Sequence, residues 1–448
     1  MVGCRVKRDC RVMPESHRCR IDKRVRHSPT RAGGPPDSPR VCRDFHGNLA
    51  LSLLAAACGR AIVNHTAIPL PVIHWAEAGV ARSALWRSES GNPPPKRVIV
   101  GDDQISADAA YRLACEGTAI LWRGDFQNAR QLLQALTRRV ERKPRKASAA
   151  PVASPTEAFH LHRQAQSRRA RTLAMLLLPL EGDYGIPLRR APDARQACME
   201  AYGPVDGPIN GPSVVSLREL LGLIGAHEWR KKGVAVPALG DRIHPHYGVF
   251  APIRGEYVEL VATAPLPART LAFDIGTGTG VLAALLARRG IARIVATDQD
   301  PRALACARAN IARLGLADQV EVVAADLFPE GRAPLVVCNP PWLPARPSSP
   351  IEHAVYDPDS RMLRGFIAGL AAHMTPGGEG WLVLSDLAEH LGLRSRAELL
   401  AAFDAAGLKV IERSDVRPSH PRAADATDPL HAARAAEMTS LWRLAAAT

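Results

Sequence analysis

The stretch that decides the fold runs from Leu271 to Gly280 and reads Leu-Ala-Phe-Asp-Ile-Gly-Thr-Gly-Thr-Gly. Its first half is a short apolar run typical of a buried strand, and the helical stretch 281–289 follows its last glycine directly. Glycines at alternate positions let the backbone turn sharply and approach a ligand closely. Open α/β sheets bind ligands at the carboxyl ends of their strands. The stretch therefore predicts a ligand-binding loop at the edge of such a sheet.

The spacing of the glycines indicates which kind of ligand the loop takes. The dinucleotide fingerprint requires a glycine three residues after its second glycine, and Val281 occupies that position. The pattern therefore argues against NAD and favours a different nucleoside cofactor.

Residues 245–448 continue the pattern, because short apolar strands alternate with helices rich in Ala, Leu and Arg. We predict an α/β fold with a doubly wound, seven-stranded sheet. We expect the last two strands, with no clear helix between them, to form an antiparallel hairpin at the edge. The seven predicted strands are Leu271–Ile275, Arg293–Thr297, Val320–Ala324, Leu335–Cys338, Gly380–Ser385, Leu408–Arg413 and Thr439–Leu444.

Acidic residues follow the second and third of these strands. Asp298 can accept hydrogen bonds from both hydroxyls of a ribose, and Asp326 is placed to meet the exocyclic amine of an adenine. The alternative role for each is capping the next helix. Asp300 is a better cap candidate than Asp298, because Pro301 follows it at the first helical position.

The fourth strand ends in Asn339-Pro340-Pro341-Trp342. The prolines stop the strand and fix the backbone, so an Asn amide oxygen and a proline carbonyl can both accept from one NH2 group beside an aromatic face. The alternative is an incidental polyproline turn. Further along, Asp357 and Asp359 could assist proton removal, although capping a helix that starts near Ser360 is the favoured role.

Together, Asp-Ile-Gly-Thr-Gly-Thr-Gly, Asp298, the run Ala-Ala-Asp-Leu-Phe and Asn-Pro-Pro-Trp resemble class I S-adenosylmethionine-dependent methyltransferases. The similar group contains release-factor glutamine and base-amino RNA and DNA methyltransferases. The resemblance implies S-adenosyl-L-methionine as cofactor and a catalytic set of Asn339, Pro340 and Trp342, in which Trp replaces the commoner Tyr or Phe. It implies that the cofactor is held at its methionine end by Asp274, Gly276, Gly278 and Gly280, at the ribose by Asp298, and at the adenine by Asp326 and Leu327. The segment 249–256 resembles the family's stretch that packs over the cofactor, with one extra residue between Pro252 and Arg254.

The N-terminal half carries a different pattern. A strand at Arg97–Val100, a helix at Ala107–Cys115, a strand at Thr118–Trp122 and a helix at Asn128–Arg139 predict a small α/β module. We therefore divide the chain into a disordered basic extension (1–45), this α/β accessory module (46–141), a linker (142–156), a mostly helical basic accessory region (157–244) and the methyltransferase domain (245–448). Residues 49–57 are predicted as an ordinary helix in preference to a signal segment.

Charge separates the two halves. The 448 residues carry 58 Lys+Arg and 44 Asp+Glu. Residues 1–45 hold 12 basic and 5 acidic residues, 46–240 hold 25 and 16, and 241–448 hold 21 and 23. An excess of basic residues is what binding to a polyanion requires. We therefore favour a nucleic-acid base, RNA rather than DNA, as methyl acceptor, with a protein glutamine as the alternative. A non-catalytic nucleic-acid-binding protein on a methyltransferase scaffold is a further alternative.

The apolar and charged fractions, the cysteines and the length of the apolar runs narrow the class of protein further. Apolar and charged fractions of 46% and 23% exclude a disordered or collagen-like chain. Five of the nine cysteines lie in the first 58 residues and the other four are scattered singly, a pattern that favours a reduced cytoplasmic protein over a disulfide framework. No apolar run is long enough for a membrane span, and we predict no membrane partner and no metal site. The alternative of a metal knuckle at Cys4, Cys10, His17 and Cys19 lacks a Cys-x-x-Cys pair.

Overall fold

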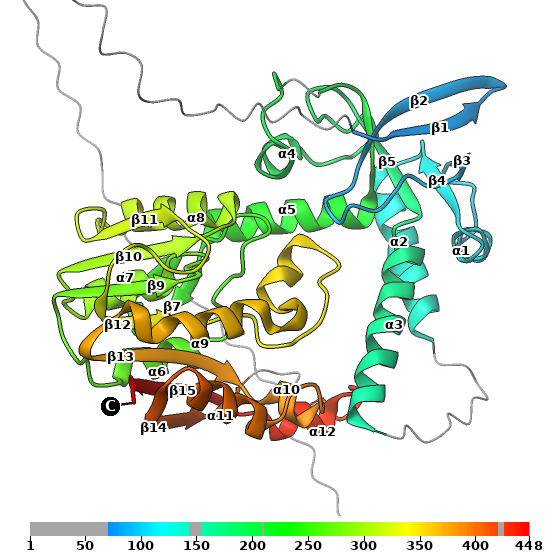
Figure 1. Ribbon diagram of the computed structural model, residues 1–448. Coiled ribbons are helices and arrows are strands. Elements are labelled where there is room, and N and C mark those ends of the chain that lie inside the picture. The colour runs from blue at the N-terminus through cyan, green and yellow to red at the C-terminus, as the bar shows by residue number, and fades with distance from the viewer. Residues whose placement is uncertain (1–69, 143–153, 208–209, 420–424, 448) are drawn as a thin grey trace, which may run out of the picture. The chain divides into compact units, whose positions relative to one another are not determined.

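The computed structural model describes residues 70–142, 154–207, 210–419 and 425–447 (Figure 1). The chain divides into the units Met1–His65 and Thr66–Thr448, and all described residues belong to the second. The predictions for residues 1–45, including the metal knuckle, and for the helix at 49–57 lie outside the described residues. Within the described ranges, every helix is too short or too polar to cross a bilayer.

The C-terminal half, residues 245–448, is built on a seven-stranded sheet with the order β11-β10-β9-β12-β13-β15-β14. Strands β9 to β13 are parallel, and β15 runs antiparallel to both of its neighbours. All seven predicted strands are confirmed. Their bounds are β9 Leu271–Ile275, β10 Arg293–Asp298, β11 Val320–Ala324, β12 Ala333–Cys338, β13 Met374–Ser385, β14 Leu408–Val416 and β15 Thr439–Ala446.

The predicted hairpin of the last two strands needs one correction. β14 and β15 do pair antiparallel, but β15 inserts between β13 and β14, and the short helix α12 (His431–Ala436) lies between the two strands in sequence. The helix was missed because only one of its six residues, Ala433, is buried, so it carries no periodic apolar face.

Helices cover both faces of this sheet, as a doubly wound fold requires (Figure 1). One apolar core joins the sheet to α6 (Glu256–Thr263), α7 (Val281–Arg288) and α8 (Pro301–Arg313). A second core joins the other face to α9 (Arg361–His373) and α11 (Arg396–Ala405). Seven of the eight residues of α7 are apolar and all seven are buried, because this helix packs directly behind the glycine loop.

The described residues before position 245, called the accessory half below, form a six-stranded sheet with the order β1-β2-β6-β5-β4-β3. Its strands are β1 Val72–Glu77, β2 Val80–Arg87, β3 Arg97–Gly101, β4 Thr118–Trp122, β5 Leu176–Leu180 and β6 Ser213–Ser216. Its helices include α1 Ala107–Cys115, α2 Phe126–Glu141, α3 Pro155–Leu173, α4 Arg195–Tyr202 and α5 Leu217–Lys232. The four elements predicted between residues 97 and 139 are confirmed.

The prediction that residues 157–244 are mostly helical misses four strands, namely β5, β6 and the small antiparallel pair β7 Val234–Val236 and β8 Asp241–Ile243. β5 and β6 lie in this region, and they join β1 to β4 in one sheet, so the two accessory segments share one structure. Short, fully buried apolar runs can form either a central strand or a helix, and their periodicity does not distinguish the two. The α3 helix also begins at Pro155, inside the segment predicted as a linker.

Candidate active site

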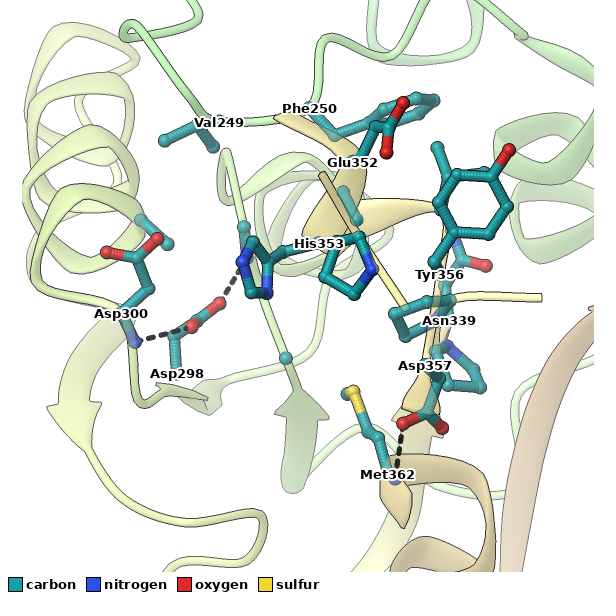
Figure 2. A pocket seen from close by; sticks show the side chains of 18 of the residues that line it. Val249, Phe250, Asp298, Asp300, Asn339, Glu352, His353, Tyr356, Asp357 and Met362 are labelled. Carbon is teal, nitrogen blue, oxygen red and sulfur yellow. Dashed lines mark hydrogen bonds between the residues drawn. The ribbon is translucent and has the colours of Figure 1, made fainter. Parts of the chain in front are cut away.

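A cavity of about 1070 Å³ opens at the carboxyl ends of β9, β10 and β12 (Figure 2). Figure 2 shows Asp298 and Asp300 on one side of it, Asn339 and Asp357 on the other, and His353 between them. The predicted site residues found in its wall are Asp274, Gly276, Gly278, Asp298, Asp326, Leu327, Asn339, Pro340 and Trp342. Nine of the ten predicted site residues therefore line one cavity, and only Gly280 does not.

The three glycines of the loop have different structural roles. All three have a positive φ, +70° at Gly276, +56° at Gly278 and +80° at Gly280. A β-carbon on Gly276 would collide with the Met362 side chain, whereas one on Gly278 would meet nothing within 4 Å. A β-carbon on Gly280 would lie 3.3 Å from the backbone of Ala307 in α8. Gly276 therefore makes room for the Met362 side chain, Gly278 leaves backbone open to the cavity, and Gly280 lets α7 and α8 pack closely.

Asp274 is a buried carboxylate beneath the loop. It is 1% exposed, and its Oδ2 accepts hydrogen bonds from Thr277 Oγ1 at 2.6 Å and from the Ala283 backbone N–H at 3.0 Å. Burial raises the pKa of Asp274 to about 6, because removal from water disfavours the charged form. These bonds fix the loop to the start of α7.

This buried carboxyl predicts a pH dependence of stability. The folded pKa of about 6 exceeds the unfolded value, so between about pH 4 and 6 the folded chain retains a proton that the unfolded chain has lost. The contribution of Asp274 to the free energy of unfolding should therefore fall by roughly 3 kcal/mol as the pH rises through this window. Chemical denaturation of the wild type and Asp274→Asn at pH 4 and pH 7 measures this fall. A difference between the two proteins that is the same at both pH values would contradict it.

Asp298 and Asp300 have separate roles. Asp298 accepts the Gly278 N–H on Oδ2 and the Asp300 N–H on Oδ1, both at 3.0 Å, and it still lines the cavity. Burial raises the pKa of Asp298. Asp300 Oδ1 accepts the Arg302 N–H at 2.8 Å and caps α8, as its position before Pro301 predicted. The carboxylate that supports the glycine loop is therefore Asp298, not the helix cap.

Asp326 and Leu327 follow β11 at the cavity wall. Leu327 has a φ of +73°, and its carbonyl accepts a hydrogen bond from Thr297 Oγ1 at 2.5 Å. The Asp326 carboxylate forms an ion pair with Arg361 at 2.6 Å. Both side chains of the pair are 59% exposed, so water screens it strongly. The Asp326 carboxylate is therefore still accessible to a polar group in the cavity.

The Asn339 side chain is held by its own tetrapeptide. Trp342 Nε1 donates to Asn339 Oδ1 at 2.9 Å. An amide oxygen has two lone pairs, so this bond orients Asn339 and leaves it able to accept once more. Pro340 lines the cavity next to it.

Arg254 covers the Trp342 ring. Its guanidinium carbon lies 4.9 Å from the ring centroid, and it pairs with Glu256 at 2.6 Å and Glu437 at 3.1 Å. Glu437 is buried and also accepts from Ser385 Oγ at 2.7 Å. The segment 249–256 therefore contributes Arg254 to the cavity wall despite its extra residue, and the two ion pairs of Arg254 hold its guanidinium over the indole.

A loop after the tetrapeptide closes one side of the cavity, and sequence reasoning missed it. Its cavity-lining residues are Leu343, residues 347–350 and residues 352–358, with His353 and Tyr356 visible in Figure 2. Asp357 accepts the Met362 and Leu363 N–H groups, both at 3.2 Å, which confirms its predicted capping role at α9. Glu89 and Ser90 of the accessory half also line the cavity, and Glu89 pairs with Arg302 at 2.7 Å. No pattern in the sequence linked these segments to the site.

The strand order, with one antiparallel strand inserted next to the edge, and the glycine loop after β9 agree with the class I methyltransferase fold expected from the sequence. Residues 243–406 match the family model described as "Methyltransferase small domain". This part of the chain therefore resembles a methyltransferase small domain, and S-adenosyl-L-methionine is the cofactor that this resemblance indicates. No cluster of potential metal ligands occurs among the residues that the structure describes.

The particular relatives are protein methyltransferases by name. The chain is 37% identical over 146 residues to a ribosomal protein L11 methyltransferase of Pelotomaculum thermopropionicum, covering 32% of this chain and 39% of that protein. It is 40% identical over 111 residues to a release factor glutamine methyltransferase of Cereibacter sphaeroides, covering 24% and 36%. The chain thus spans less than half the length of these two relatives. A crystal structure of a ribosomal protein L11 methylase from Lactobacillus delbrueckii subsp. bulgaricus aligns with a TM-score of 0.33 and 16% identity, over 46% of this chain and 86% of that one.

Proposed function

We propose that the chain is an N-methyltransferase that transfers a methyl group to a planar nitrogen, with a protein side-chain amide of the glutamine type as the favoured acceptor. The observation that carries this proposal is the position of Asn339, Pro340 and Trp342 in the wall of the same cavity as the glycine loop and Asp298. An acceptor nitrogen held by the tetrapeptide would therefore share one enclosed space with the cofactor.

The chain offers groups that suit each part of S-adenosylmethionine. The open backbone at Gly278 suits the methionine moiety, and the free lone pairs of Asp298 suit the ribose hydroxyls. Asp326 and Leu327 are proposed to contact the adenine. When bound, the cofactor supplies an electrophilic methyl group on a sulfonium sulfur.

The tetrapeptide residues would activate the acceptor nitrogen. An amide nitrogen is a poor nucleophile because its lone pair is delocalised into the carbonyl. Asn339 Oδ1 and the Pro340 carbonyl would each accept one N–H, which favours a pyramidal nitrogen whose lone pair points into the cavity. The same acceptors stabilise positive charge as it develops on nitrogen. No strong base is required, because the proton becomes acidic once the nitrogen has been attacked and can leave to water.

Two observations bear on the acceptor. The relatives named above are called release factor glutamine and ribosomal protein methyltransferases. Among the described accessory residues, many basic side chains are already paired with carboxylates and so contribute less to a phosphate-binding surface. These are Arg123, Arg139, Arg163, Arg169, Arg190, Arg195, Arg230, Lys231 and Lys232.

A nucleic-acid base is the second candidate, supported by the 25 basic and 16 acidic residues of segment 46–240. Its exocyclic amine has the same planar nitrogen, and its ring could stack on Trp342. A non-catalytic nucleic-acid-binding role is a weaker proposal, because Asp274, Asp298 and Asn339 are all in place at the cavity.

Labelled methyl transfer tests the function and the acceptor together. The purified chain is incubated with lysate of a strain that lacks it and with methyl-labelled S-adenosylmethionine, and the product is digested with nuclease or protease. We expect label that survives nuclease and is released by protease. Label released by nuclease would instead identify a nucleic-acid base. If Asn339→Ala labels the lysate as well as the wild type does, the tetrapeptide is not the acceptor site.

A further inference from the structure

Helix α3 contacts the methyltransferase domain through one face. Thr156 Oγ1 donates to the Leu391 carbonyl at 2.9 Å, and Phe159, which is 2% exposed, belongs to an apolar cluster with Leu343 and Leu387. Arg163 is the third contact residue of this helix. Positions 156, 159 and 163 follow the i, i+3, i+7 spacing of a single helix face. Helix α3 therefore contacts the C-terminal half at three positions along its length.

Arg163 is the residue of this face that reaches the active-site loop. Its guanidinium pairs with Glu352 Oε2 at 3.1 Å and donates to the Arg346 carbonyl at 2.6 Å. Its Cζ also lies 4.0 Å from the centroid of the Tyr356 ring. The Arg163 and Glu352 side chains are 22% and 30% exposed, so the pair is partly withdrawn from water. One side chain thus contacts three positions, spaced over eleven residues of the same loop.

The loop that Arg163 contacts forms a wall of the cavity. Residues 347–350 and 352–358 line it, and Figure 2 shows Glu352, His353 and Tyr356 around it. Inside the loop, Glu352 Oε2 also accepts from Ser348 N at 2.8 Å and from Ser348 Oγ at 2.7 Å. Arg163 and Ser348 therefore meet at one carboxylate oxygen, which links the accessory helix to the residues that face the cavity.

We propose that Arg163 is a positioning residue for methyl transfer, which holds the loop 343–358 in place against the cavity through Glu352, the Arg346 carbonyl and Tyr356. This inference rests on the proposed function. It assigns the accessory half a role in completing the active site, in addition to any part in binding the acceptor. Because a planar guanidinium makes the ion pair, the carbonyl hydrogen bond and the ring contact together, lysine should replace it only in part.

Hydrogen exchange of the full-length chain without ligands tests the position of the loop. In Arg163→Ala, peptides that cover residues 343–358 should exchange at least about tenfold faster, since a hydrogen bond between charged partners is worth a factor of ten or more. Arg163→Lys should recover part of this protection. Arg168→Ala, an exposed arginine five residues further along α3, is the matched control and should exchange like the wild type.

The rate of methyl transfer then tests whether the position of the loop 343–358 matters for the reaction. With the acceptor fraction labelled by the wild type, Arg163→Ala should transfer at least about tenfold more slowly, while its melting temperature falls by only about 2–4 °C. Unchanged exchange of the loop would overturn the proposal, and so would faster exchange throughout the domain, which would show a general structural role. If the wild type transfers no methyl group while its loop is protected, the proposed function fails and the loop contact made by Arg163 is retained.

Discussion

Replacing Asn339 with alanine should lower the rate of methyl transfer by about 10²-fold to 10³-fold, the range found when one preorganised hydrogen-bonding group is removed from an active site. Asn339 Oδ1 is held by Trp342 Nε1 at 2.9 Å, so the acceptor needs no reorganisation when the substrate arrives. Alanine removes this acceptor and leaves the indole N–H without its partner. The loop that would hold the cofactor is unchanged, so affinity for S-adenosylhomocysteine should stay within about threefold, a free-energy change below 1 kcal/mol.

Single-turnover transfer and calorimetry separate these two effects. Asn128→Ala is a suitable control, because Asn128 donates to Asp103 in the accessory half and does not line the cavity. We expect Asn128→Ala to transfer like the wild type. Equal transfer rates for Asn339→Ala and the wild type would show that the proposed pair of acceptors does not activate the nitrogen.

Replacing Asp298 with alanine should weaken the binding of S-adenosylhomocysteine by at least about 10²-fold. Two hydrogen bonds from ribose hydroxyls to a carboxylate would be lost, and bonds to charged groups contribute about 1.5–3 kcal/mol each. The Gly278 N–H, held by Asp298 Oδ2 at 3.0 Å, would also lose its partner, so the glycine loop would be less well ordered.

Asp300→Ala is the matched comparison, because this carboxylate lines the same cavity two residues away but uses its Oδ1 to cap α8. Loss of a cap costs about 1 kcal/mol of stability. We therefore expect Asp300→Ala to melt at a lower temperature and to bind S-adenosylhomocysteine nearly as the wild type does. If isothermal titration shows the same affinity for Asp298→Ala and the wild type, Asp298 does not hold the ribose.

The methyltransferase half could be predicted from the sequence because its signals are local. Each predicted site residue lies in the last two positions of a strand or within five residues after it. The carboxyl ends of parallel strands share one edge of a sheet, so residues distant in the chain are brought together at the cavity. The separate roles of Asp298 and Asp300 could also be predicted, since Pro301 marks the start of the helix.

The accessory contribution could not be predicted in the same way. Arg163 looked like one more basic residue of a charged helix, and its partners Glu352 and Tyr356 lie almost 200 residues later in the chain. Likewise, the hairpin β1–β2 was missed because its turn, Ala78-Gly79, has Ala with a φ of +50°, a conformation that Asn or Asp adopts more often. The contacts of Arg163 with Glu352 and Tyr356 are determined by tertiary packing and leave no local pattern.

Calorimetric titration of the full-length chain with S-adenosyl-L-methionine tests the central claim most directly. The cavity that joins the glycine loop, Asp298 and the Asn-Pro-Pro-Trp segment predicts saturable binding of one cofactor per chain. Absence of binding at millimolar cofactor would contradict the assignment of this cavity.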